Sequence, residues 1–185
     1  MAAPSPSPTP PAPPLAPFIV TGELPGDILG WADGLRRAHF PPERNHLTAH
    51  VTLFHSFAPS MREELPRFLA AMAGEFAPPP AEVTGLMDLG GGTALAIRSP
   101  GLLAVRSRIA ERFHDMLTRQ DQGGKKLHIT IQNKVPRAEA VALQQALAPG
   151  LPCPRFAFTG LGLHIYRNPH WEPVAVWKFR GQQGA

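Results

Sequence analysis

The sequence is poor in cysteine and in long apolar runs, and each shortage excludes a class of protein. Cys153 is the single cysteine among 185 residues, so no internal disulfide can form and a cysteine-rich metal site is excluded. No stretch approaches about 18 continuous apolar residues, which argues against a membrane-spanning helix. The N-terminus lacks the basic start and apolar run of a secretory signal. From these absences we expect a soluble, cytoplasmic protein.

The sequence also has little excess charge. Lysine and arginine together number 18 against 14 aspartates and glutamates, which leaves a net charge of +4. Such a charge permits a phosphate-bearing partner, but a histone-like or polybasic nucleic-acid binder would carry more. With 43% hydrophobic residues, the chain can form one domain with a proper core, or two small lobes that share one.

The first 16 residues differ in composition from the rest of the chain. They consist mainly of proline, alanine and serine, so they cannot bury a core and should be disordered or polyproline-like. Such a segment is either a proline-rich ligand for a partner domain or a dispensable tail, and we favour the tail. The folded domain is expected over residues 17–181.

Short β-branched segments alternate with amphipathic segments along this domain. One helix is predicted to begin at Asp27, which would be its N-cap, and another at Ser60, which would form a capping box with Glu63. Two more helices are predicted over about 102–120 and 137–148. Strands are predicted at 17–24, 47–57, 82–90, 92–99, 127–135, 155–167 and 172–180. The order is β-α-β-α-β-β-α-β-α-β-β, which indicates an α+β fold whose second half echoes the first.

Two of the predicted strands carry the same four-residue pattern. HVTL at 50–53 is matched by HITI at 128–131, and each segment follows a helix and a loop and precedes a helix. Alternate side chains of a strand share a face, so the histidine and the threonine point the same way, roughly 6.5–7 Å apart along the backbone. The aliphatic residues between them point to the opposite face and anchor the strand in the core. One such tripeptide arises easily by chance, but two in matching contexts do not.

Two such strands facing each other across a cleft could bind a phosphodiester and catalyse its cleavage. One neutral histidine takes a proton from the attacking oxygen, and one charged histidine gives a proton to the departing oxygen. Histidine fits both roles because its unperturbed pKa, about 6.5, lets both protonation states coexist near neutrality. The two threonine hydroxyls can donate to the non-bridging oxygens, and the scheme needs no metal.

The two motifs, their spacing and the duplicated α+β order resemble the two-histidine (2H) phosphoesterase superfamily. The stretch PERNHLTAHVTLFHSF, residues 42–57, is especially similar to its bacterial 2'-5' RNA ligase-like branch. The resemblance covers about residues 17–181. It implies a single bilobal domain, with two pseudo-twofold related lobes of antiparallel sheet, helices packed outside and a central cleft. It also implies metal-independent and cofactor-free chemistry on RNA-type phosphodiesters.

By motif match, the resemblance assigns His50 and His128 as the acid/base pair and Thr52 and Thr130 as phosphate-binding residues. The implied reaction is the opening of a 2',3'-cyclic phosphate on an RNA end or a small cyclic nucleotide. We also expect a monomer that binds no membrane. The alternatives are a 2'-5' RNA ligase, a 2'-5' phosphodiesterase and a weakly active RNA-binding module. In the ligase-like enzymes the first-motif histidine is often assigned as the acid toward the 2' oxygen, while the second activates water. The sequence leaves that assignment open.

Further substrate contacts are expected close to the motifs. Lys125, Lys126 and Lys134 flank the second motif, where basic side chains would raise the local concentration of anions. His46 lies at the entrance of the first motif. Tyr166 lies in a later strand and could stack a nucleobase, as aromatic residues do in single-stranded RNA sites, although packing is the commoner role. Trp171 is a similar candidate.

Two other histidine patterns do not indicate a functional site. His46 and His50 are four residues apart, a spacing that would suit zinc on a helix, but this segment is a predicted loop and strand without carboxylate or cysteine ligands nearby. We therefore expect no metal site. His55 is an odd number of residues from His50, so on an unbroken strand it faces away from the site and has a structural role.

Overall fold

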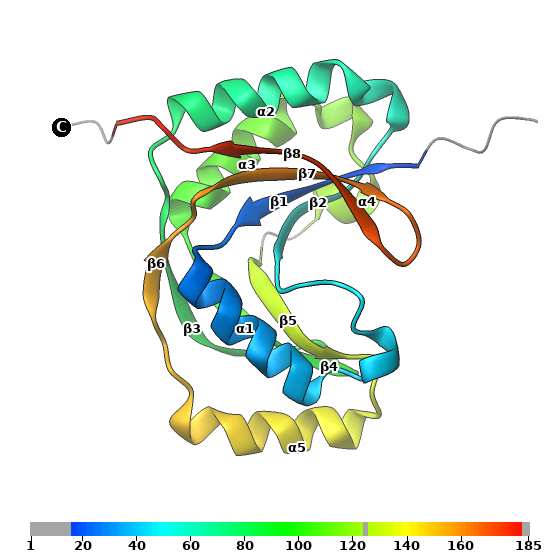
Figure 1. Cartoon of the computed structure of the whole chain (residues 1–185), viewed down its shortest axis with the longest axis vertical. Helices are drawn as coiled ribbons and strands as arrows, with labels where there is room; N and C mark the ends of the chain where they lie inside the picture. The colour runs from blue at the N-terminus through cyan, green and yellow to red at the C-terminus, as the bar shows by residue number, and fades with distance from the viewer. Residues whose placement is uncertain (1–15, 124–125, 183–185) are drawn as a thin grey trace, which may run out of the picture.

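The computed structural model describes residues 16–123 and 126–182, and these form two four-stranded antiparallel sheets with helices outside them (Figure 1). The proline-rich tail expected over residues 1–16 therefore lies outside the described residues, except for Ala16. The strands are β1 Phe18–Glu23, β2 Val51–Phe57, β3 Pro80–Asp88, β4 Gly92–Arg98, β5 His128–Asn133, β6 Arg155–Ala157, β7 Gly160–Tyr166 and β8 Trp171–Lys178.

The α-helices connect these strands, and short 3-10 turns join several of them. The helices are α1 Gly26–His39, α2 Glu64–Glu75, α3 Pro100–Arg112, α4 Arg119–Gln122 and α5 Arg137–Leu147. The 3-10 turns are η1 Pro42–Arg44, η2 Pro59–Arg62, η3 His114–Met116 and η4 Ala148–Gly150. No helix in the described part of the chain is long and apolar enough to cross a membrane.

The two sheets have equivalent edges. Their strand orders are β2-β1-β7-β8 and β5-β4-β3-β6, and every pairing is antiparallel. Each motif strand, β2 or β5, lies at the edge of its sheet and pairs with the strand that precedes it in the chain, β1 or β4. A helix joins the two strands of each pair, α1 in the first and α3 in the second. The expected α+β duplication is confirmed.

The core joins both sheets, and helices cover them. The buried apolar residues of both sheets and of α1, α2 and α3 form a single cluster. In Figure 1, α2 lies against β7 and β8, and α5 lies against β3 and β4. In contrast, α1 packs against β5, the motif strand of the other sheet. The first lobe therefore supplies a helix that supports the second motif.

Three predicted boundaries were wrong for local reasons. The N-cap of α1 is Pro25, so Asp27 lies in the first turn. Ser60 lies in η2, and α2 begins later, at Glu64, without a side-chain cap. The helix predicted over 102–120 ends at Arg112 and is followed by η3 and α4. In the last two cases, residues at helical spacing lie in short 3-10 turns, so their spacing alone predicts a longer helix.

The strand predicted over 155–167 is in fact two strands in different sheets. β6 pairs with β3, and β7 pairs with β1 and β8. The chain passes from one sheet to the other at Phe158, whose side chain is fully buried. An apolar alternation that continues across a sheet boundary cannot be distinguished from one strand by its period alone.

Candidate active site

The two motif strands contact each other across the gap between the sheets. His50 lies immediately before β2, and His128 is the first residue of β5. The alternation expected for both motifs is present, because the intervening aliphatic residues are buried while the motif threonines are half-buried. The buried residues are Val51, Leu53, Ile129 and Ile131, each at most 2% exposed. The β2 and β5 edges lie close together, with Cα atoms of the two strands within 8 Å of each other.

Each motif histidine shares a cavity with the threonine of the other motif. His50 and Thr130 line one cavity, and Thr52 and His128 line another. Two strands that face each other with opposite directions place their residues in this way, since the first residue of one motif then lies beside the third residue of the other. All four motif side chains therefore border the space between the two sheets.

Both motif histidines are held in the same way by the backbone. Nδ1 of His50 lies 2.7 Å from the carbonyl oxygen of Thr48, and Nδ1 of His128 lies 3.0 Å from that of Lys126. A carbonyl oxygen only accepts hydrogen bonds, so each Nδ1 carries a proton and donates it. In a neutral ring, Nε2 then has the lone pair. This is the tautomer that a general base requires at Nε2.

The surroundings of His50 favour its neutral form. The pKa of His50 is lowered from 6.5 to about 4. Burial is the largest cause, the hydrogen bond to Thr48 opposes it, and the charges of Arg36, His164 and His128 contribute to the lowering. The ring packs against Trp171, with 4.5 Å between the ring centroids. His50 is therefore an uncharged imidazole near neutral pH, able to accept a proton.

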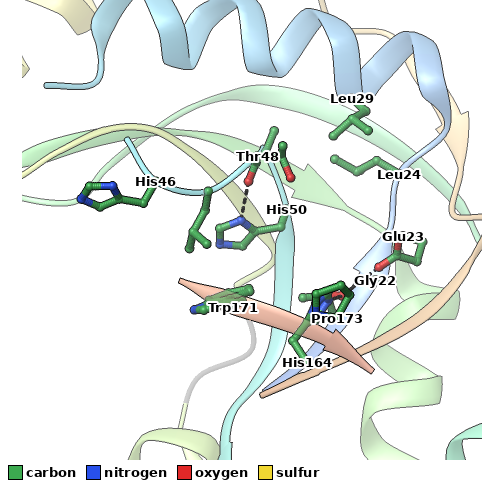
Figure 2. Close-up of a pocket in the computed structure, with 13 residues that line it drawn as sticks. Gly22, Glu23, Leu24, Leu29, His46, Thr48, His50, His164, Trp171 and Pro173 are labelled. Atoms are coloured by element: carbon green, nitrogen blue, oxygen red, sulfur yellow. Dashed lines mark hydrogen bonds between the residues drawn. The ribbon is translucent and has the colours of Figure 1, made fainter. Parts of the chain in front are cut away.

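A cavity of about 340 Å³ opens beside His50 on the side of the first sheet (Figure 2). Trp171 separates His50 from His164, whose ring centroid lies 5.6 Å from that of the tryptophan. Thr21 donates its hydroxyl to Glu23 Oε1 at 2.9 Å, and its oxygen lies 3.0 Å from Nε2 of His164. Sequence reasoning did not connect these three polar residues with His50, because they come from β1 and β7.

The sequence analysis also did not identify two buried arginines, Arg36 and Arg106. Arg36 of α1 donates to the carbonyl oxygen of Thr130 at 2.7 Å, and Arg106 of α3 donates to that of Leu53 at 3.0 Å. Burial lowers the pKa of both guanidinium groups. Each arginine lies four residues after a buried apolar residue of its helix, Ala32 or Leu102. A charged residue within an apolar stripe is the signal that could have found them.

His55 faces the site, contrary to the expectation for an unbroken strand. Thr21 pairs with Thr52 and Val20 pairs with Phe54, so β2 has one extra residue between these two partners, a β-bulge. The bulge reverses the alternation, and His55 lines the same cavity as Thr52 and His128. Its Nδ1 donates to the buried carboxylate of Asp121 at 3.0 Å.

The remaining candidates are placed as follows. His46 lines the cavities on both sides of His50, and Lys126 lines the cavity that contains Thr52 and His128. Lys134 follows β5 and lines a shallow cavity with His46. Tyr166 lies at the end of β7, where it pairs with Trp171 of β8 and its hydroxyl donates to Asn168. Lys125 lies outside the described residues.

A metal site needs several ligands in one place. Within residues 16–123 and 126–182, no three histidine, cysteine, aspartate or glutamate side chains are grouped so that they could hold a metal ion.

Residues 24–170 match the family described as the 2'-5' RNA ligase superfamily. The chain belongs to the 2'-5' RNA ligase superfamily. The match covers both motifs, the whole second sheet and strands β2 and β7 of the first, so the family resemblance drawn from the sequence is confirmed. No curated protein matches the sequence.

Several solved structures share the fold of this chain at low sequence identity. The protein TT0787 of Thermus thermophilus is 14% identical, with a TM-score of 0.63 over 90% of this chain and 100% of its own. Escherichia coli LigT complexed with NADP+ is 19% identical, with a TM-score of 0.57 over 92% of this chain and 100% of its own. LigT complexed with 3'-AMP is 17% identical, with a TM-score of 0.55 over 91% of this chain and 99% of its own. These likenesses show the LigT-like fold alone.

Proposed function

We propose that this member of the superfamily is a metal-independent phosphodiesterase that opens 2',3'-cyclic phosphates of RNA ends or small nucleotides. The observation that supports this most directly is the matched pair of motif histidines. Each donates its Nδ1 proton to a backbone carbonyl, and each shares a cavity with the threonine of the opposite motif. A phosphate between the two strands would have an acid/base group and a hydroxyl donor on either side.

The reaction assigns one role to each histidine. His50 is neutral near pH 7, because burial lowers its pKa, and its Nε2 takes a proton from water. The water oxygen bonds to phosphorus, the bond from phosphorus to one ribose oxygen breaks, and His128 gives its proton to that oxygen. The product is a phosphomonoester with a free ribose hydroxyl. This assignment is the reverse of the one that the family resemblance suggested for the first-motif histidine.

The threonines and Arg36 stabilise the charge that develops on the phosphate. Thr52 and Thr130 are half-buried hydroxyls on the two sides of the site and donate to the non-bridging oxygens. Arg36 lines the cavity of His50 and Thr130, and it adds positive charge beside the phosphate. Donors fixed before the reaction stabilise the transition state more than mobile water does.

A nucleotide is the substrate class that we infer. The related LigT has been solved with 3'-AMP, NADP+ and ATP, and each of these ligands combines a nucleobase with phosphate. The same four motif groups can also form or cleave a 2'-5' linkage, because a catalyst accelerates both directions of a reaction. The family description favours this as the second candidate.

The test is turnover of 2',3'-cyclic nucleotides and of 2'-5'-linked dinucleotides by the purified protein with EDTA present. We expect hydrolysis of the cyclic substrates, and a loss of roughly 10²–10⁴ in rate in either His50→Ala or His128→Ala. His114→Ala is the control, because His114 is an exposed histidine in η3, outside both motif strands. Dependence on added metal, or full activity in both motif variants, would contradict the proposal.

A further inference from the structure

The cavity beside His50 has the dimensions and lining of a site for one small planar group. Its volume, about 340 Å³, falls at the lower end of the range for small-molecule pockets. The side chains of Leu24, Leu29, Leu47 and Pro173 give it apolar walls, and Trp171 offers an aromatic ring (Figure 2). The cavity begins at His50, so a group attached to the reacting phosphate through a ribose can reach it.

The polar end of this cavity has a defined hydrogen-bond direction. Thr21 has one hydroxyl proton, and it donates that proton to Glu23 Oε1 at 2.9 Å. The contact of 3.0 Å between Thr21 and Nε2 of His164 must therefore be a bond that His164 donates. The chain of donors ends at the carboxylate, which can only accept further hydrogen bonds. Among the described residues, no donor is directed at the other oxygen of Glu23, Oε2.

The backbone leaves room for this arrangement at one position. Gly162 on β7 pairs with Thr21 on β1, and a Cβ atom at residue 162 would overlap Glu23 Oε1 and Thr21 Oγ1 and would touch Nε2 of His164. Only a glycine lets the three polar groups meet beneath the cavity. The carboxylate is thus held at a fixed position in the lining, although it belongs to a half-buried residue at the end of a strand.

We propose that this cavity is a nucleobase subsite in which Trp171 stacks the base and Glu23 selects guanine. Guanine presents two adjacent donors, the N1–H and the 2-amino group, to a carboxylate. Adenine and cytosine present one amino donor beside a ring nitrogen that is an acceptor, and uracil presents one N–H between two carbonyl oxygens. Each of those acceptors would repel the carboxylate. Stacking contributes to binding for every base, so the discrimination comes from Glu23.

This inference rests on the proposed function, which places the phosphate between the two motifs, and it predicts a base preference. Among the four 2',3'-cyclic nucleotides, the guanosine substrate should have the highest kcat/KM, by about tenfold or more. Glu23→Gln should remove that preference, because it replaces one carboxylate oxygen by an amide donor. The amide oxygen can still accept from Thr21, so the fold should be retained. Glu111→Gln, at an exposed position on α3, is the matched control.

Direct binding separates this inference from the proposed function. Calorimetric titration with 3'-GMP and 3'-AMP requires no turnover. We expect the wild type to bind 3'-GMP more tightly than 3'-AMP, and Glu23→Gln to bind the two nucleotides equally. If no cyclic substrate is hydrolysed but this preference is found, the subsite stands and the proposed reaction is wrong. If all four cyclic substrates are hydrolysed at similar rates and Glu23→Gln lowers them equally, the subsite is wrong. Glu23→Ala, which also lacks the carboxylate, must lose the same preference if the inference is right.

Discussion

His50 should make the protein less stable as the pH falls, and the size of the effect follows from its surroundings. Its pKa is about 4 in the folded protein against 6.5 ordinarily, because the ring is buried beside Trp171 and near Arg36. Between these two pH values, the unfolded chain binds a proton that the folded chain does not. The free energy of unfolding therefore falls as the pH drops from 6.5 to about 4, and His50 contributes no pH dependence above that range.

The magnitude can be worked out from the pKa difference. At 1.36 kcal/mol per pH unit, the interval between 6.5 and about 4 corresponds to about 3 kcal/mol. Solvent reaches part of the half-buried ring and screens its charge, which reduces the expected contribution to about 2 kcal/mol. A loss of this size is a large fraction of the stability of an ordinary domain.

Urea unfolding of the wild type and of His50→Gln, at about pH 7 and about pH 4, measures this contribution. The variant should lose about 2 kcal/mol less than the wild type between the two pH values. Groups with lowered pKa values whose charges do not act on His50, such as Asp88, affect both proteins alike and cancel in the comparison. His114→Gln is the control at an exposed site. Equal losses in the wild type and His50→Gln, or an NMR titration of His50 near 6.5, would refute the reasoning.

Three further outcomes follow from the same site. Arg36→Met should raise the pKa of His50, measured by NMR, because it removes a nearby positive charge; an unchanged titration would contradict this. Asp121→Asn should lower stability by about 1–3 kcal/mol in urea unfolding, because the carboxylate accepts from two backbone N–H groups of β2; unaltered stability would show that the amide replaces it. Thr52→Val and Thr130→Val should each reduce kcat/KM by about tenfold without unfolding, and normal rates in both would exclude phosphate contacts.

The motif strands could be predicted from the sequence because their physics is local. The alternation of His50, Val51, Thr52 and Leu53 depends only on the period of a strand, and the structure confirms which residues are buried. The second copy made the pattern specific. The sequence does not reveal the bulge after Thr52, because an extra residue in one strand is defined by the register of its partner.

The cavity beside His50 was beyond prediction for a different reason. Thr21, Glu23 and His164 lie on β1 and β7, which are separated by most of the chain and meet only through strand pairing. His164 has no threonine two residues later, so the sequence around it gives it no evident partner. The partner is Thr21, contributed by the neighbouring strand. Contacts that depend on sheet order are not encoded in any short window of sequence.

The two buried arginines connect the separate halves of the chain. Arg36 belongs to the helix between the strands of the first lobe, yet it donates to the carbonyl of Thr130 in the second motif. Arg106 belongs to the corresponding helix of the second lobe, and it donates to the carbonyl of Leu53 in the first motif. Each lobe thus fixes the backbone of the other motif. Burial of a charged guanidinium is costly without such hydrogen bonds. The distance between the two motif edges is therefore set by the helices that cross between lobes, and not by the motif strands themselves.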